Sequence, residues 1–134
     1  MDRWTPKTRS ALMRKVRVKD TAPEMIVRRV LHRLGYRFRL HRKDLPGTPD
    51  IVLPSRRKIV LVNGCFWHGH SCRKGALPKS RVDSWAAKIT ANRLRDRRTV
   101  LELERQGWHV LTIWECEAGD SAYLEARLLA FLSD

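Results

Sequence analysis

The stretch PGTPDIVLPSRRKIVLVNGCFWHGHSC, residues 46–72, decides the fold. Two short apolar runs, at residues 51–53 and 59–62, flank a basic turn at residues 55–57. This pattern is typical of two buried strands joined as a hairpin. Asp50 begins the first strand, and a glycine ends the second. The hairpin is therefore expected to bring a carboxylate and the loop that follows the second strand to the same end of a β-sheet.

A helix is expected upstream of this hairpin. It begins at Asp20 or Thr21, with Pro23 and Glu24 in its first turn. A missing N–H and a negative charge both suit the N-terminus of a helix. Apolar residues then recur at helical spacing until Gly35, which ends the element.

The other expected elements alternate between helix and strand. In chain order they are a basic N-terminal arm with a short helix (1–20), a strand (36–41), a turn (44–47), a basic loop (73–82), a long helix from Ser80 or Asp83 to Gln106, a strand (108–114) and a helix (121–132). This order predicts an α/β fold, with a central mixed β-sheet flanked by helices, in a single domain over residues 1–134.

The charge of the chain indicates a polyanionic partner. Its 134 residues include 28 Lys and Arg against 14 Asp and Glu, a formal net charge of +14. Such an excess favours binding to nucleic acid. No apolar stretch is long enough to span a bilayer, and the first residues lack the apolar core of a signal peptide. We therefore expect no membrane association and a cytoplasmic location.

The cysteines and one histidine form a candidate metal site. Cys65, His70 and Cys72 lie in one short loop, and Cys116 follows the strand at 108–114, which could lie beside the hairpin. Zinc prefers four such ligands, and a full set of protein ligands is typical of a structural ion. Buried cysteine acting as a small apolar residue is the better interpretation of Cys116 alone, but not of the triplet in the loop.

Three further residues could form a hydrolytic centre. Asp50 is a candidate ligand for a hard cation beside a scissile phosphate. Histidine is the commonest general base, so His68 is a candidate for that role, and Glu24 offers a second carboxylate if its helix packs on the hairpin. Each also has a structural interpretation: a turn residue at a strand start, a spare zinc ligand or structural histidine, and a partner of the helix dipole.

Several aromatic residues lie in or next to basic segments of the sequence. Phe66 and Trp67 lie within the metal loop, and Trp85 begins the arginine-rich helix. Aromatic side chains can insert between base steps of DNA as wedges, so these three are candidate intercalating residues. Trp108 and Trp114, on a strand, are assigned to the core.

Taken together, the motifs resemble those of the very short patch repair (Vsr) DNA mismatch endonucleases. They are TRSALMRKVRVKDTAPE (8–24), PGTPDIV (46–52), NGCFWHGHSC (63–72), RDRR (95–98) and GWHVLTIWEC (107–116). The resemblance implies a PD-(D/E)xK restriction-endonuclease-like fold that nicks DNA 5′ to the thymine of a T:G mismatch, with catalytic Mg²⁺ and structural Zn²⁺. It also implies double-stranded DNA as the partner of a monomer that associates with the nucleoid when bound and works with mismatch-repair proteins.

The same resemblance assigns roles to individual residues. Asp50 and the main-chain carbonyl of Val62 would hold Mg²⁺, His68 would activate water, and Glu24 would help to orient it. Asp96 matches an acidic position with a structural role. The four candidate metal ligands would bind zinc, and the three candidate wedge residues would intercalate beside the mismatch.

Two residues depart from the family pattern. The family usually has threonine at the position of Val62, which matters little to a main-chain ligand. It usually has histidine at the position of Asn63, a candidate catalytic residue here that can hydrogen-bond but cannot carry a positive charge. The glutamate and lysine of the superfamily motif are also absent, since the matching positions read Leu61, Val62 and Asn63.

These departures leave two other functions open. The first is a nuclease of the same fold with broader or different mismatch or modified-site specificity, which Asn63 would favour. The second is a zinc-stabilised DNA-binding protein without activity. Asp50, His68 and Glu24 weigh against the second, because binding alone requires none of them.

Overall fold

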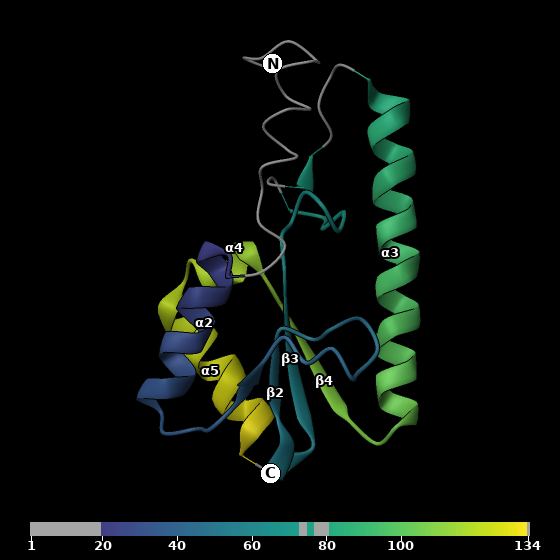
Figure 1. Cartoon of the computed structure of the whole chain (residues 1–134). Coiled ribbons are helices and arrows are strands. Elements are labelled where there is room, and N and C mark those ends of the chain that lie inside the picture. Colours follow the sequence, from purple (N-terminus) through teal and green to yellow (C-terminus); the bar gives the residue numbers. More distant parts are fainter. Residues whose placement is uncertain (1–19, 73–74, 77–80, 134) are drawn as a thin grey trace.

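Four strands form one mixed sheet in a computed structural model that describes residues 20–72, 75–76 and 81–133. The strands, in their order across the sheet, are β1 (Arg39–Leu40), β2 (Ile51–Leu53), β3 (Lys58–Asn63) and β4 (His109–Trp114). β1, β2 and β3 are antiparallel neighbours, whereas β4 runs parallel to β3 (Figure 1). The expected mixed sheet is confirmed.

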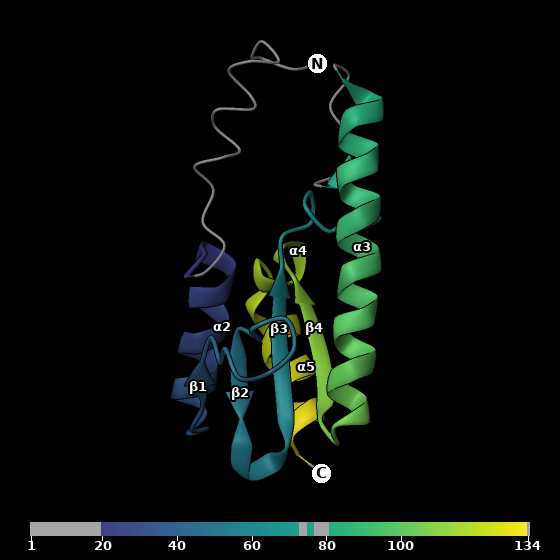
Figure 2. The ribbon, with the colours of Figure 1, turned by 45° about the vertical axis from the view of Figure 1, so that its right-hand side comes forward.

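Helices cover both faces of this sheet. They are α2 (Ala22–Arg33), α3 (Val82–Arg105), α4 (Glu115–Ala118) and α5 (Ser121–Leu132), with a 3-10 turn, η1 (Pro54–Arg56), between β2 and β3. α2, α4 and α5 lie on one side of the sheet and α3 on the other, with the N-terminal half of α3 extending past the strand ends (Figures 1 and 2). Among the helices in the described ranges, none combines the length and apolar character that a membrane span needs.

The core explains why the hairpin strands are apolar throughout. Ile51 and Leu53 belong to the larger buried cluster, which α2 and α5 cover. Val52 points to the opposite face, into a smaller cluster with Leu103 of α3 and Trp108. Successive side chains of a strand alternate between faces, so a strand covered on both sides reads as a continuous apolar run.

Local signals place most element boundaries correctly. The Thr21 hydroxyl caps α2 by accepting a 3.3 Å hydrogen bond from the Glu24 N–H, and α5 spans the expected residues. In the hairpin, Ile51 pairs with Val60, and β3 extends one residue further at each end than expected. The turn closes at Arg57, whose φ of 56° is in the left-handed region.

Two expectations at the sheet edges need correction. The strand expected at residues 36–41 pairs only at Arg39–Leu40, because His41 has a φ of 47° and turns the chain. The short helix α4 was not expected, and it carries Cys116. The helix expected within the N-terminal arm lies outside the described residues.

The parallel pair of β3 and β4 positions the functional residues. Its register continues to the ends of both strands, where Asn63 pairs with Trp114. The segments that follow the two strands therefore start side by side. One of these segments carries Cys65 and the other carries Cys116.

Candidate active site and metal centre

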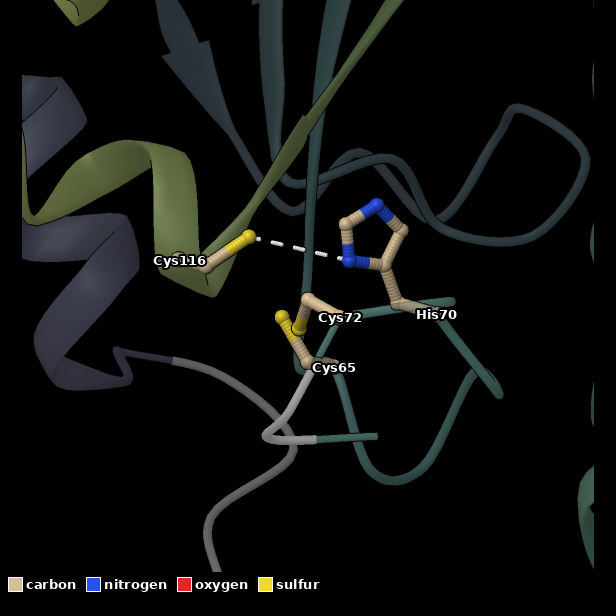
Figure 3. Close-up of side chains that lie close together, drawn as sticks. All are labelled: Cys65, His70, Cys72 and Cys116. Carbon is tan, nitrogen blue, oxygen red and sulfur yellow. Dashed lines mark hydrogen bonds between the residues drawn. The ribbon is translucent and has the colours of Figure 1, made fainter. Parts of the chain in front are cut away.

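Cys65, His70, Cys72 and Cys116 converge beyond the ends of β3 and β4 (Figure 3). One donor atom from each lies within 4.8 Å of all the others, and Cys116 Sγ is 3.6 Å from Nδ1 of His70. A sulfur about 2.3 Å and a nitrogen about 2.0 Å from a tetrahedral zinc ion would lie about 3.5 Å apart. The four side chains could therefore hold a metal ion, and their donor set is one that zinc prefers.

Neighbouring residues hold this cluster in place. The ring of Trp114 stacks on His70, with 4.2 Å between ring centroids and 16° between planes. Glu115 accepts a 3.3 Å hydrogen bond from the backbone N–H of Cys65. The assignment of Trp108 to the core is confirmed, but Trp114 is half-buried and packs against the metal loop instead.

The protonation state of Cys65 links metal binding to pH. Burial raises the pKa of the Cys65 thiol to about 12, although a hydrogen bond from the Cys116 backbone opposes the shift. A buried thiolate is costly without a positive charge beside it. Metal binding would therefore release protons, and metal affinity would rise with pH.

A cavity of about 1260 Å³ opens beside this cluster, where β2 begins and β3 ends. Its lining includes six of the residues expected to act in catalysis or DNA binding: Asp50, Val62, Asn63, Phe66, Trp67 and His68. Its polar walls also include Asn92, Arg95 and Asp96 of α3 and His41 from the β1–β2 loop. The hairpin thus brings most of the candidate residues to one cavity.

Asp50, the residue immediately before β2, is a carboxylate inside this cavity. Its Oδ2 accepts a 2.9 Å hydrogen bond from the backbone N–H of Val62. Burial raises the pKa of Asp50 to about 6, the Val62 hydrogen bond opposes that rise, and the charge of Glu24 adds to it. Ionising a buried carboxyl group is costly when it stands alone. A cation bound beside it favours the ionised form.

His68 forms a pair with Asp96, to which the family resemblance assigns a structural role. Its Nδ1 is in hydrogen-bonding contact with Oδ2 of Asp96, from the middle of α3. A carboxylate on one ring nitrogen fixes the tautomer, so Nε2 keeps its lone pair and can accept a proton. The spacing between positions 68 and 96 carries no signal for this contact, which depends on how α3 packs on the loop.

Glu24 lies behind the cavity wall. Its side chain is only 2% exposed, and Glu24 is not among the cavity-lining residues. Its carboxylate accepts from the Asp20 N–H at 3.2 Å, contacts Arg28 at 3.3 Å and lies 2.8 Å from Nε2 of His41. Sequence reasoning missed His41, because a lone histidine after a short strand has no motif to identify it.

The three candidate wedge residues form one aromatic cluster. Phe66 and Trp67 meet edge to face at 5.3 Å, and Trp85 of α3 lies 5.5 Å from Phe66 and 6.0 Å from Trp67. Trp85 is only 5% exposed, whereas the other two are half-buried and line the cavity. In this structure Trp85 therefore packs behind the pair, and Phe66 and Trp67 offer the accessible aromatic surface.

Comparisons with known proteins agree on one family. The model of the family "DNA mismatch endonuclease Vsr" matches residues 1–74. The Type II nicking enzyme V.XorIIP of Xanthomonas oryzae pv. oryzae is 61% identical over 127 residues, 95% of this chain and 93% of that protein. The DNA mismatch endonuclease Vsr of Escherichia coli is 41% identical over 109 residues, 81% of this chain and 70% of that protein.

A solved structure supports the fold. The catalytic domain of the homing endonuclease I-Bth0305I matches with a TM-score of 0.55 and 22% identity, covering 84% of this chain and 94% of that domain. Its likeness extends to the architecture of the mixed sheet and flanking helices. Together with the family match, this shows that the chain belongs to the Vsr family of DNA mismatch endonucleases, with the restriction-endonuclease-like fold of a DNA-cleaving enzyme.

Proposed function

We propose that this endonuclease nicks double-stranded DNA on the 5′ side of the thymine in a T:G mismatch, using Mg²⁺ for catalysis and Zn²⁺ for structure. The observation that carries the proposal is the meeting of two pairs in one cavity: Asp50 with Val62, and His68 with Asp96. The name of the Escherichia coli relative, a DNA mismatch endonuclease, supports the substrate class.

The donor chemistry supports each metal. Asp50 supplies a carboxylate oxygen and Val62 a main-chain carbonyl oxygen, the hard ligands that Mg²⁺ accepts. When bound there, Mg²⁺ would polarise the scissile phosphate and offset the charge that develops on its oxygens. Cys65, His70, Cys72 and Cys116 fit Zn²⁺, and four protein ligands leave it no open position for catalysis.

His68 acts as the general base in this proposal. Asp96 holds Nδ1, so Nε2 takes a proton from water as that water attacks the phosphorus. The bond from phosphorus to the 3′ oxygen breaks in line with the attack. The products are a 3′ hydroxyl and a 5′ phosphate.

Phe66 and Trp67 supply the wedge that selects the mismatch. Insertion between bases costs a few kcal/mol of stacking, and the cost is smallest where pairing is already poor. The two rings line the same cavity as Asp50, so a wedge there would bring a nearby phosphate toward the carboxylate. Trp85 would then support the inserted pair from α3.

One experiment tests the proposal and its two alternatives. Duplexes that carry T:G, other mismatches or only paired bases are incubated with the protein, with and without Mg²⁺, and the nick is mapped on each strand. We expect Mg²⁺-dependent nicking only in the T:G duplex and only 5′ to the thymine. Nicking of several mismatches would favour the broader nuclease that Asn63 suggests, and binding without nicking would favour an inactive DNA-binding protein. That the protein is monomeric and works with repair partners stays a prediction.

A further inference from the structure

Glu24 does not line the cavity, which changes the role expected of it. Its side chain is 2% exposed and stays behind the wall, whereas His41, bonded to it, lines the cavity. A carboxylate bonded to a cavity-lining imidazole is also found at Asp96 and His68, although Asp96 is partly exposed and lines the cavity itself. The cavity therefore has two histidine–carboxylate pairs, one beside α3 and one beside α2.

Two contacts hold His41 in an uncommon backbone conformation. Its Nε2 lies 2.8 Å from Oε2 of Glu24, and its backbone N–H donates a 3.1 Å hydrogen bond to the carbonyl of Asp50. Its φ of 47° is in the left-handed region, which a side chain with a Cβ rarely adopts. Such strain persists only where surrounding contacts maintain it, and it is concentrated at functional sites.

The bond to Glu24 determines which ring atom His41 can offer. A carboxylate only accepts, so Nε2 carries the proton of this bond and Nδ1 keeps a lone pair. Within the described parts of the chain, Nδ1 of His41 has no hydrogen-bond partner. Mg²⁺ usually retains several of its waters, and the hydrogens of those waters need acceptors.

A second metal ion is a weaker interpretation of the same residues. Asp20, Glu24 and His41 do bring donor atoms within 4.8 Å of one another. However, Arg28 already occupies the space between the two carboxylates, 2.8 Å from Asp20 and 3.3 Å from Glu24. A cation there would have to displace the guanidinium group.

We propose that His41 is a positioning residue, which accepts a hydrogen bond from a water of the catalytic metal ion while Glu24 acts only through it. The inference rests on the proposed metal position at Asp50. It predicts that His41 and Glu24 behave as one unit, and that both affect metal binding as well as the nicking rate.

The test uses four variants of the full chain: His41→Gly, His41→Gln, Glu24→Gln and the double variant His41→Gly with Glu24→Gln. Glycine suits a positive φ, so it removes the imidazole without straining the backbone. Glutamine keeps one donor and one acceptor on a side chain of similar reach. The exposed His109 of β4, changed to glutamine, is the matched control.

Two measurements are made on each variant. Single-turnover nicking of a T:G duplex is measured against Mg²⁺ concentration, and Mn²⁺ is titrated by calorimetry into the zinc-loaded, DNA-free protein.

We expect His41→Gly to remain folded at the assay temperature, to bind Mn²⁺ more weakly and to nick about 10- to 100-fold more slowly. His41→Gln should recover much of both losses. Adding Glu24→Gln to His41→Gly should cost little more, since residues that act as a unit are not additive.

Three outcomes would overturn the inference: parent-like nicking and Mn²⁺ binding by His41→Gly, losses in the double variant that simply add, or loss of activity with unchanged Mn²⁺ binding and no recovery by glutamine. If the parent protein fails to nick T:G duplexes, the proposed function fails by itself. The Mn²⁺ titrations of the parent, His41→Gly and His41→Gln then still decide the role of His41.

Discussion

The backbone N–H of Val62 donates a 2.9 Å hydrogen bond to Oδ2 of Asp50, which joins the start of β2 to the C-terminal part of β3 at the cavity. The N–H and C=O of one strand residue face the same neighbouring strand. The carbonyl of Val62 therefore lies on the side of Asp50, where a carboxylate and a carbonyl oxygen could share one cation. Only backbone atoms of Val62 would take part in such a site, and its side chain would not.

Asp50→Asn should abolish nicking while DNA binding in Ca²⁺ persists. The asparagine oxygen can still accept from Val62, but an amide is a poor ligand for Mg²⁺ beside a phosphate. At neutral pH the variant should also be more stable than the parent, by at most about 3 kcal/mol, since a buried charge with a pKa raised to about 6 has been removed. Single-turnover cleavage and thermal melting check the two effects. Nicking near the parent rate would place the active centre elsewhere.

Nicking should increase as the pH rises through about 6, the pKa of Asp50, because only the ionised carboxylate holds a metal ion. Higher Mg²⁺ should move this midpoint to lower pH, since the cation competes with the proton.

Without Mg²⁺, the stability of the folded protein should fall as the pH rises over the same range. Between about pH 4 and 6 the folded protein holds a proton at Asp50 that the unfolded chain has lost, so the free energy of unfolding falls as the pH rises. Melting curves for the parent and Asp50→Asn over this range isolate the contribution of Asp50.

Asp96→Asn should slow nicking by about 10²- to 10⁴-fold, the usual contribution of a general base. An asparagine amide can donate to Nδ1 of His68, which would leave the proton on Nε2 and block the base. His68→Ala should cost a similar factor, and the double variant should be little slower than either single one. Glu104→Gln, at an exposed position of the same helix, is the control. Additive losses would show that Asp96 does not act through His68.

Cys116→Ser should lower metal content and remove several kcal/mol from the free energy of unfolding, because metal binding contributes directly to the stability of such a site. The effect should match that of Cys72→Ser, although Cys116 comes from a different segment. Elemental analysis and chemical denaturation measure both quantities, with the exposed His32→Asn as control. Folded parent protein without zinc would refute the assignment of this cluster.

Trp67→Ala should weaken the preference for mismatched over paired DNA more than it weakens binding to either duplex. Insertion of the aromatic side chain contributes to binding only where the base stack opens, whereas the basic surface binds both duplexes. Competition titrations with T:G and paired duplexes give the ratio. Tyr123→Ala removes an aromatic ring that is 49% exposed on α5 and serves as the comparison. An equal loss on both duplexes would make Trp67 a simple contact or packing residue.

The sequence by itself determined the features that depend on neighbouring residues. Two apolar runs around a turn identify the hairpin, and the hydroxyl of Thr21 marks the start of α2. The type and spacing of the cysteines in the metal loop predict a metal site. These signals act over a few residues, where covalent geometry and backbone hydrogen bonds limit the conformations available.

Only the tertiary structure decided which distant residues meet. The β3–β4 register brings Cys116 to the metal loop, the packing of α3 brings Asp96 to His68 and buries Trp85, and the packing of α2 puts Glu24 behind His41. Each contact joins segments whose separation along the chain carries no periodic signal. Burial of the two apolar clusters determines where each helix packs on the sheet. The positions of the helices then determine which polar side chains meet.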